Sequence, residues 1–193
     1  MGCGKNGSFS PLPDARLCAL FLIDYKSDNY GKAVSLPKFI EKWLQFFGAE
    51  VCTISLQPIN GHGSWDGKMP FANMDSENKT ASSIAVLTRA SIKKRKLFSF
   101  WKQVPAVEKA TKQAKGLIFS LGMGEIPFIR QATFSIWEDV AHLKQFAYQG
   151  KAHHQVISQS KVEDWYSEQL FFRFVLLKIE GSIAGIIPLI GNP

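Results

Sequence analysis

A weak internal duplication constrains the fold of this chain more than any other feature of its sequence. The nine residues that begin at Gly63 follow the pattern G-S-x-x-G-x-x-P-[FL], and the pattern begins again at Gly181, 118 residues later. Each copy follows an apolar stretch of strand composition, over residues 51–59 and 171–179. Such self-similarity predicts two copies of one structural unit in the chain.

The second copy predicts a complete unit, and the first copy predicts only part of one. The elements expected in the second copy are a strand at 84–92, a basic amphipathic helix at 95–115, strands at 117–121 and 131–137, a helix at 138–162 and a strand at 171–179. This βαββαβ order is typical of the ferredoxin-like unit. In the first copy a strand at 17–24 corresponds to 131–137, but the first strand and helix have no counterpart.

We therefore predict an α+β fold built of ferredoxin-like βαββαβ units in a dimeric α/β-barrel-type arrangement. Residues 1–75 form an incomplete first repeat, residues 84–193 form a complete second repeat, and the two pack as one domain. Their sheets face each other and leave a space between sheet and helices. The incomplete first repeat exposes a sheet edge, which favours contact with a partner.

Charge is distributed unevenly between the repeats. Residues 1–83 hold eight Lys/Arg and eight Asp/Glu, whereas residues 84–193 hold fifteen and eight. The excess is concentrated between Arg89 and Lys115. A solvated helix face explains such a surface, and so does docking of an acidic electron donor, anionic lipid or nucleic acid. Because no RNA-binding aromatic motif or recognition helix accompanies the charge, nucleic-acid binding is the weakest of these interpretations.

Cysteine usage and hydropathy bear on the compartment. Cys3, Cys18 and Cys52 are odd in number and lack metal-ligand spacing, which favours a reducing environment. No apolar run approaches the roughly 18–20 residues that span a bilayer. We expect a cytoplasmic protein, with at most peripheral contact with the inner face of a membrane. A homo-oligomer is also compatible with the exposed edge.

Several irregular motifs carry a family resemblance. QATFS-x-W begins at Gln131, FAY at Phe146, and WYSE-x-LF-x-RF at Trp165, with His153 seven residues past Phe146. With the stretches around Ala85, Phe100 and Gly122, they make residues 84–180 resemble the spheroidene monooxygenase family. Residues 1–71 resemble the first half of that family, including the stretch that begins at Gly63. The family's chains begin earlier, with an added strand and helix, so the resemblance implies a shortened first half.

The resemblance implies a haem-dependent monooxygenase. Its expected reaction places oxygen on the end of a linear carotenoid such as spheroidene, with reduced ferredoxin as the electron donor. His153 matches the family's histidine and is the expected axial ligand of the iron. His154 is its rival, because a shift of one residue exchanges the two. Without the resemblance, a solvent-facing or capping histidine is the simpler interpretation.

Two arginines and five aromatic residues complete the candidate site. Arg130 and Arg173 could each hold a haem propionate by charge-assisted hydrogen bonds. Arg173 lies in an apolar strand, and pairing with Glu168 is the structural alternative. Aromatic side chains could line a tunnel for a rigid polyene, although packing in the core is the simpler interpretation of each. These residues are Trp137, Tyr148, Trp165, Tyr166 and Phe174.

The residues leave three classes of function open. The first is the monooxygenase. The second is a non-catalytic protein of the dimeric α/β-barrel group that binds haem or a small hydrophobic ligand. The third is a basic protein that binds nucleic acid, supported only by the run Lys93, Lys94, Arg95 and Lys96. No residue is assigned as catalytic from its chemistry alone.

Overall fold

The computed structural model describes residues 1–23, 36–71, 83–149 and 163–183, and within them one curved sheet of seven strands. The second repeat supplies β4 (Ile84–Ile92), α2 (Leu97–Lys112), β5 (Leu117–Ile126), β6 (Arg130–Trp137), α3 (Val140–Gln149) and β7 (Tyr166–Gly181). The first repeat supplies β1 (Gly2–Gly4), β2 (Pro13–Cys18), α1 (Lys38–Phe46) and β3 (Cys52–Gly63). Two short 3-10 turns, η1 (Lys5–Gly7) and η3 (Lys94–Lys96), complete the described elements.

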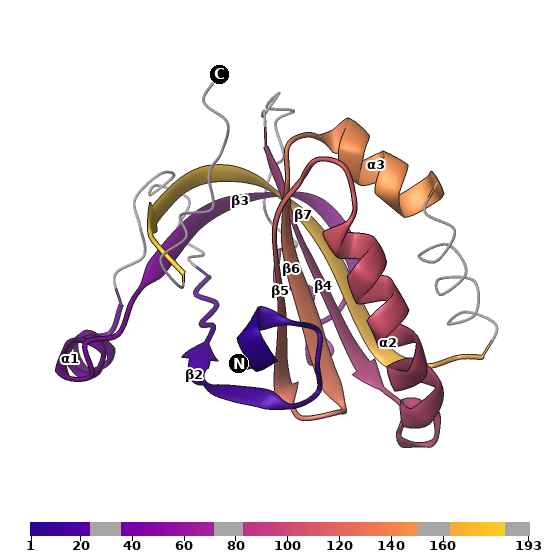
Figure 1. The fold of residues 1–193 in the computed structure, drawn as a ribbon, viewed down its shortest axis with the longest axis horizontal. Helices are drawn as coiled ribbons and strands as arrows, with labels where there is room; N and C mark the ends of the chain where they lie inside the picture. The colour runs from indigo at the N-terminus through magenta and orange to yellow at the C-terminus, as the bar shows by residue number, and fades with distance from the viewer. Residues whose placement is uncertain (24–35, 72–82, 150–162, 184–193) are drawn as a thin grey trace.

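The second repeat has ferredoxin-like topology. Its strands lie in the order β5-β6-β4-β7, and each pair of neighbours is antiparallel. The helices α2 and α3 cover the same face of these strands, on the outside of the curved sheet in Figure 1. The predicted βαββαβ order is therefore confirmed, and the fold is α+β.

The first repeat extends both edges of this sheet. β1 pairs with β5 and carries β2 beyond it, whereas β3 pairs with β7 along almost its whole length. The full order is β2-β1-β5-β6-β4-β7-β3, and the sheet curves so strongly that the two repeats face each other across its concave side (Figure 1). In the described part of the first repeat, no strand or helix corresponds to β4 and α2.

The repeated motif forms equivalent turns at the ends of β3 and β7. Gly63 and Gly181 both have positive φ, +98° and +82°, which favours glycine. A Cβ atom on Gly63 would lie 2.0 Å from the carbonyl oxygen of Gln169, and one on Gly181 would lie 1.9 Å from that of Val51. Because Val51 and Gln169 are also 118 residues apart, the two turns are related by the approximate two-fold symmetry of the repeats.

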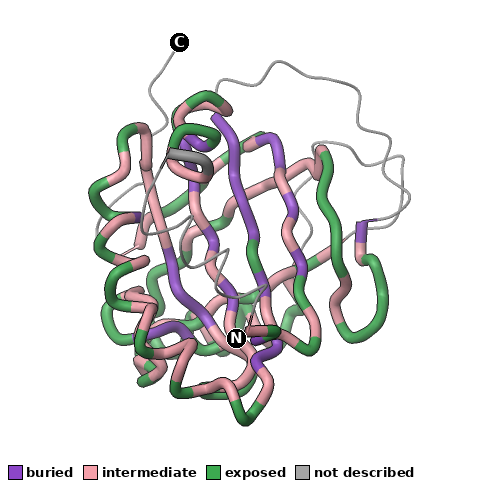
Figure 2. The backbone as a smooth tube through the Cα atoms, turned by 90° about the vertical axis from the view of Figure 1, so that its right-hand side faces the viewer, coloured by how far each residue is buried: buried purple, intermediate pink, exposed green. Residues whose placement is uncertain are grey.

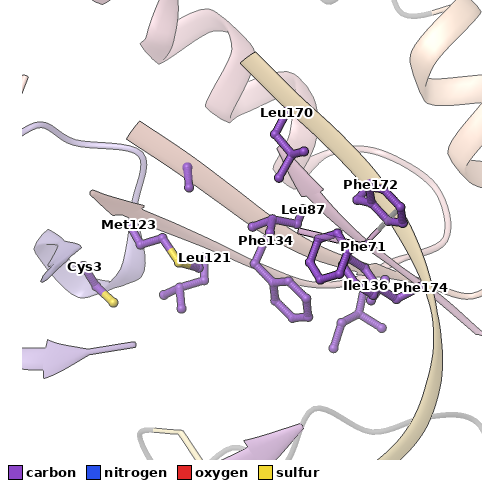
Figure 3. Close-up of a cluster of buried hydrophobic side chains, with 12 residues drawn as sticks. Cys3, Phe71, Leu87, Leu121, Met123, Phe134, Ile136, Leu170, Phe172 and Phe174 are labelled. Atoms are coloured by element: carbon purple, nitrogen blue, oxygen red, sulfur yellow. The ribbon is translucent and has the colours of Figure 1, made fainter. Parts of the chain in front are cut away.

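The main core lies on the concave face of the sheet. Alternate residues of each strand point to this face, so cross-strand rows such as Leu87, Phe134 and Phe172 meet there. Figure 3 shows this cluster, to which Cys3 of β1 and Phe71 also contribute. Apolar side chains of β3 and of residues 17–23 pack against it, so both repeats share one core.

A smaller core lies between the sheet and its helices. Ile84 and Val86 of β4, Trp137 of β6 and Leu143 of α3 are buried there. The burial pattern follows from the period-two alternation of the strands, and β4 is largely buried on both faces (Figure 2). The predicted basic helix is present as α2, with Pro105 inside it.

One predicted strand is only partly present. The sequence predicts a strand over residues 17–24, but β2 ends at Cys18 and residues 19–23 are not assigned to a strand. Their counterpart β6 is hydrogen-bonded on both sides, by β4 and β5. The Ala19 N–H donates to the Met1 carbonyl oxygen, and among the described residues no backbone hydrogen bond joins residues 20–23 to a neighbouring strand.

Candidate functional site

An ion cluster lies at one end of the concave face and joins the two repeats. Its centre is Arg89 of β4, whose side chain is 1% exposed. The guanidinium donates to Glu125 through Nε at 3.1 Å and Nη2 at 2.9 Å, and to Glu168 through Nη1 at 2.6 Å. The ring of Trp65 in the first repeat lies over it, with its centroid 4.9 Å from Cζ. Arg89 is thus held from three sides, as a buried cation must be.

The turn after β3 is fixed to the second repeat by the same cluster. The Ser64 hydroxyl and the Gly67 backbone N–H both donate to Glu168 at 2.8 Å. Burial alone would raise the pKa of Glu168, but the hydrogen bonds from Gly67, Arg89 and Ser64 lower it to about 2. The carboxylate is therefore ionised at neutral pH and stabilises the junction between the repeats.

The second predicted arginine, Arg130, belongs to this cluster. Its Nη1 lies 3.1 Å from Asp66 and 3.6 Å from Glu125. The cluster holds two arginines and three carboxylates, so Arg130 is already neutralised by carboxylates of this chain. Sequence reasoning did not single out Arg89 at all. The signal was available, because Arg89 lies in an apolar strand just as Arg173 does.

Arg173 lies on the opposite face of the sheet, the face that carries the helices. Its Nε donates to the side-chain oxygen of Asn60 on β3 at 2.8 Å. Pairing with Glu168 is wrong, because residues five apart along a strand point to opposite faces, and Glu168 binds Arg89 instead. Among the described residues no carboxylate lies within ion-pair distance of Arg173.

Two ring side chains lie beside Arg173 in the register of this helix-facing surface. Phe171 precedes it on the same face of β7 and stacks on His62 of β3, with ring centroids 5.6 Å apart. Thr88 of β4, opposite Phe171 in the register, is exposed although its strand neighbours are buried. We call this set, Asn60, His62, Thr88, Phe171 and Arg173, the β7 surface. It combines a cation with aromatic area and is the candidate functional site.

The predicted tunnel residues fall into separate groups. Trp137 is 1% exposed beneath α3, where its ring centroid lies 5.0 Å from that of Phe146. Trp165 and Tyr166 pack against Phe100 of α2 at the other end of β4. Phe174 lies in the concave core.

These groups do not form one continuous lining. Trp137, Trp165 and Tyr166 share the helix side of the sheet with Arg173, and Phe174 does not. Tyr148 lies in the last turn of α3, and its side chain is outside the described residues. His153 and His154 are also outside them, four and five residues beyond the end of α3. Their roles stay predictions.

The basic segment before α2 is partly neutralised. Lys93 pairs with Asp164, and the Lys96 Nζ lies 3.6 Å from Glu163. Among the described residues, Lys94, Arg95 and Lys102 have no carboxylate within ion-pair distance. No helix in the described part of the chain is long and apolar enough to cross a membrane.

Comparisons with known proteins found one matching family and several loosely similar solved structures. Residues 80–188 match a family described as Domain of unknown function (DUF3291). The fold is loosely similar to that of a protein from Fusobacterium nucleatum provisionally assigned as a monooxygenase, with a TM-score of 0.48 and 16% identity, over 67% of this chain and 52% of that one. It is also similar to Rv0793 from Mycobacterium tuberculosis, with a TM-score of 0.40 and 10% identity, over 53% and 96%. The fold class rests on the strand pairing above.

Similarity in sequence is much higher to three curated proteins, all named spheroidene monooxygenase. The protein from Rhodobacter capsulatus is 35% identical over 97% of this chain and 78% of its own length. The proteins from Cereibacter sphaeroides and Rubrivivax gelatinosus are 32% and 33% identical over 97% and 96% of this chain, and the chain covers 57% and 70% of their lengths. These relatives define an oxidoreductase of the monooxygenase class. The chain belongs to the spheroidene monooxygenase family.

Proposed function

We propose that this protein inserts oxygen at the end of a linear carotenoid such as spheroidene. The observation that carries the proposal is the match of nearly the whole chain to three relatives with that name. The helix side of the sheet supports it, because a rigid polyene requires apolar walls with few polar groups. Phe171 and Phe146, which are partly buried beside the helix-side core, would supply such walls.

Haem is the proposed cofactor. The two predicted arginines differ in whether they are free to bind a haem propionate. Arg173 is compatible with a propionate, because it faces the helix side and no described carboxylate neutralises it. Arg130 is not, because Asp66 and Glu125 already bind it on the other face. His153, just beyond α3, is the proposed axial ligand. When bound, haem would supply the activation of dioxygen at its iron.

The residues of this chain would bind and orient rather than react. Arg173 would fix the anionic edge of the cofactor by charge-assisted hydrogen bonds. Phe171 and His62 would limit the access of water to that edge, since their stacked rings lie beside it in the register. Reduced ferredoxin is the proposed electron donor, and Lys94, Arg95 and Lys102 are the proposed contacts for its acidic surface.

Haem titration of purified variants tests the proposal. Arg173→Gln should weaken haem binding by tenfold or more, since it removes a charge-assisted contact. His153→Ala should abolish or shift the Soret band of the complex. Arg130→Gln is the matched control and should bind haem as the wild type does. A subsequent assay with spheroidene, ferredoxin and its reductase should show oxygenated product only with the haem-loaded protein.

Three results would count against this proposal. Absence of specific haem binding in the wild type would show that haem is not the cofactor. Equal effects of Arg173→Gln and Arg130→Gln on haem binding would show that Arg173 does not contact haem. Haem binding without turnover of any linear carotenoid would support the alternative, a non-catalytic haem- or ligand-binding protein. Location in the cytoplasm, peripheral contact with a membrane and self-association are further parts of the proposal, open to fractionation and sedimentation.

A further inference from the structure

We propose that the start of α2 and the tip of the β5–β6 hairpin form one docking surface for an acidic redox protein. The surface has an apolar centre and a basic rim, and we call it the hairpin–helix surface. Its apolar residues are Phe98, Ile126 and Phe128, and its exposed cations are Lys94, Arg95 and Lys102. The inference rests on the electron donor proposed above, and it adds to those cations an apolar contact that increases affinity.

Trp101 joins the two elements of this surface. Its indole N–H donates to the Phe128 carbonyl oxygen at 3.0 Å, and the two rings meet edge-on with centroids 6.0 Å apart. Figure 1 shows the hairpin tip and the start of α2 at the same end of the molecule. Phe98 lies three residues before Trp101 in α2 and therefore on the same side of the helix. The contact through Trp101 thus brings Phe98 and Phe128 to one surface.

The apolar side chains of the hairpin–helix surface are exposed to solvent. Phe98 is 83% exposed, and Phe128 and Ile126 are 44% and 42% exposed. Removal of such apolar area from water is favourable, so a partner that covers these side chains gains affinity. Exposed apolar side chains that are grouped and surrounded by polar residues are typical of protein contact sites.

The backbone at the hairpin tip favours a residue other than phenylalanine. Phe128 has a φ of +66°, a left-handed conformation that bulky side chains rarely adopt and that glycine adopts freely. The ring is therefore present at a conformational cost. Its packing against Trp101 leaves 44% of the residue exposed, so the contact with Trp101 uses only part of the ring. Backbone strain of this kind is typical of functional positions, and contact with a partner would use the exposed part.

The charge around these rings favours an acidic partner. Five of the ten residues from Lys93 to Lys102 are Lys or Arg, and none is acidic. The exposed cations Lys94, Arg95 and Lys102 all lie within four residues of Phe98. An apolar centre with a charged rim is the usual composition of a protein interface, in which the rim speeds association and the centre slows dissociation. The arrangement therefore fits an acidic protein that carries an apolar patch of its own.

Binding of an oxidised [2Fe–2S] ferredoxin to variants of the 193-residue chain tests the proposal. Phe98→Ser and Phe128→Gly should each raise the Kd at least fivefold, because aromatic side chains at the centre of an interface contribute most to affinity. Neither substitution changes the charge, so the effect should persist at high salt. Phe46→Ser is the matched control, since Phe46 is 82% exposed on α1, and it should leave the Kd unchanged. Phe128→Gly should keep the hairpin folded, because glycine favours its backbone conformation.

Other outcomes would overturn the proposal. A wild-type Kd in both Phe98→Ser and Phe128→Gly would show that the contact has no apolar centre. An equal rise of the Kd in Phe46→Ser would show that the effect is not specific to this surface. Binding to phosphatidylglycerol vesicles that both ring variants lose, with ferredoxin binding unchanged, would assign the surface to a membrane.

Haem titration of the same variants separates this inference from the function proposed above. The ring variants should bind haem as the wild type does, because the hairpin–helix surface does not include Arg173. A wild-type chain that binds haem but not ferredoxin would overturn the docking surface and leave the cofactor proposal standing.

Discussion

Arg89 is a fully buried cation whose ligands come from distant parts of the chain. Glu125 follows it in the second repeat, Glu168 comes from the last strand, and Trp65 and Asp66 come from the first repeat. Burial lowers the pKa of the guanidinium, but the hydrogen bonds that it donates to Glu125 and Glu168 more than offset this, so the group stays charged. The concave core therefore ends in a charged cluster that depends on one side chain.

Removal of Arg89 should be far more harmful than removal of Arg130. Arg89→Gln leaves Glu125 and Glu168 without their main cation, and breaking a buried pair in this way costs about 3–5 kcal/mol. Arg130 is 37% exposed, and Arg130→Gln should cost about 1 kcal/mol or less. Urea unfolding of both variants measures the difference. Equal losses of unfolding free energy in the two variants would show that the burial of Arg89 does not increase its contribution to stability.

Acid should weaken the same junction. The pKa of Glu168 falls from its ordinary 4.5 to about 2 in the folded protein. A lowered carboxyl pKa contributes stability that is complete above the unfolded value and is lost as the pH falls through the folded one. The wild type should therefore exceed Glu168→Gln in unfolding free energy at pH 6, and this excess should shrink between about pH 5 and pH 2. A difference that is independent of pH would contradict the assignment.

Single residues show where sequence reasoning was limited. Arg173 could be selected from the sequence because it interrupts an apolar strand, and the same argument would have found Arg89. The face of the sheet on which each arginine lies could not be assigned from the sequence. Side chains alternate between the two faces along a strand, so the face of one residue must be known before the others can be assigned. The partners of Arg89 are separated from it by up to 79 residues, and no local pattern specifies such contacts.

At the scale of elements, the repeated turns are the most constrained features of the backbone. Gly63 ends β3 with a φ of +98° and lies against the backbone of β7. Gly67, four residues later, also has a positive φ of +74°, but no atom lies near its missing Cβ. A comparison of substitutions at the two glycines therefore distinguishes the cost of backbone strain from the cost of a steric clash.

Gly63→Ala should destabilise the protein more than Gly67→Ala. Both substitutions force a left-handed backbone on alanine, at a cost of roughly 1–2 kcal/mol. Only Gly63→Ala adds a Cβ atom 2.0 Å from the Gln169 carbonyl oxygen, so β3 must shift from β7. Thermal unfolding of the two variants should show a clearly lower Tm for Gly63→Ala. Similar Tm values for the two variants would mean that the turn at Gly63 accommodates the added Cβ atom without cost.

The elements predicted from the sequence were correct where a strand has both of its neighbours. The order of the second repeat was confirmed, and β7 was only longer than expected, Tyr166–Gly181 instead of residues 171–179. The strand predicted over residues 17–24 was partly wrong because strand propensity is not sufficient without a hydrogen-bonding partner. Propensity identified the segment, and tertiary context decided its state.

At the scale of the whole molecule, the positive charge is concentrated beside the start of α2. Lys94→Glu combined with Lys102→Glu should lower the rate of ferredoxin-supported turnover several-fold at low salt, because charge steers association. The difference should shrink as ionic strength rises. Lys178→Glu, at the far end of β7, should leave the rate unchanged. If the double variant shows the salt dependence of the wild type, the electron donor docks at a different surface.

The overall fold class was predictable because the chain contains two copies of one pattern. One copy of the motif suggests only a turn, but two copies at a fixed offset define a repeated unit and its boundaries. The way in which the two repeats pack together was harder to predict from the sequence. Joining them through β3 and β7 requires pairing in which Gly63 lies opposite Leu170, and sequence patterns do not reveal registers over such separations.

The pairing of β3 with β7 also has a consequence for biosynthesis. β3 has β7 as its only described strand partner, and β7 is completed 118 residues after β3. At roughly 5–20 residues per second, the ribosome needs on the order of 6–24 seconds to translate that interval. During this time the apolar strand has left the exit tunnel without its neighbour. The nascent first repeat is therefore a natural client for chaperones that bind extended segments, until the last strand emerges.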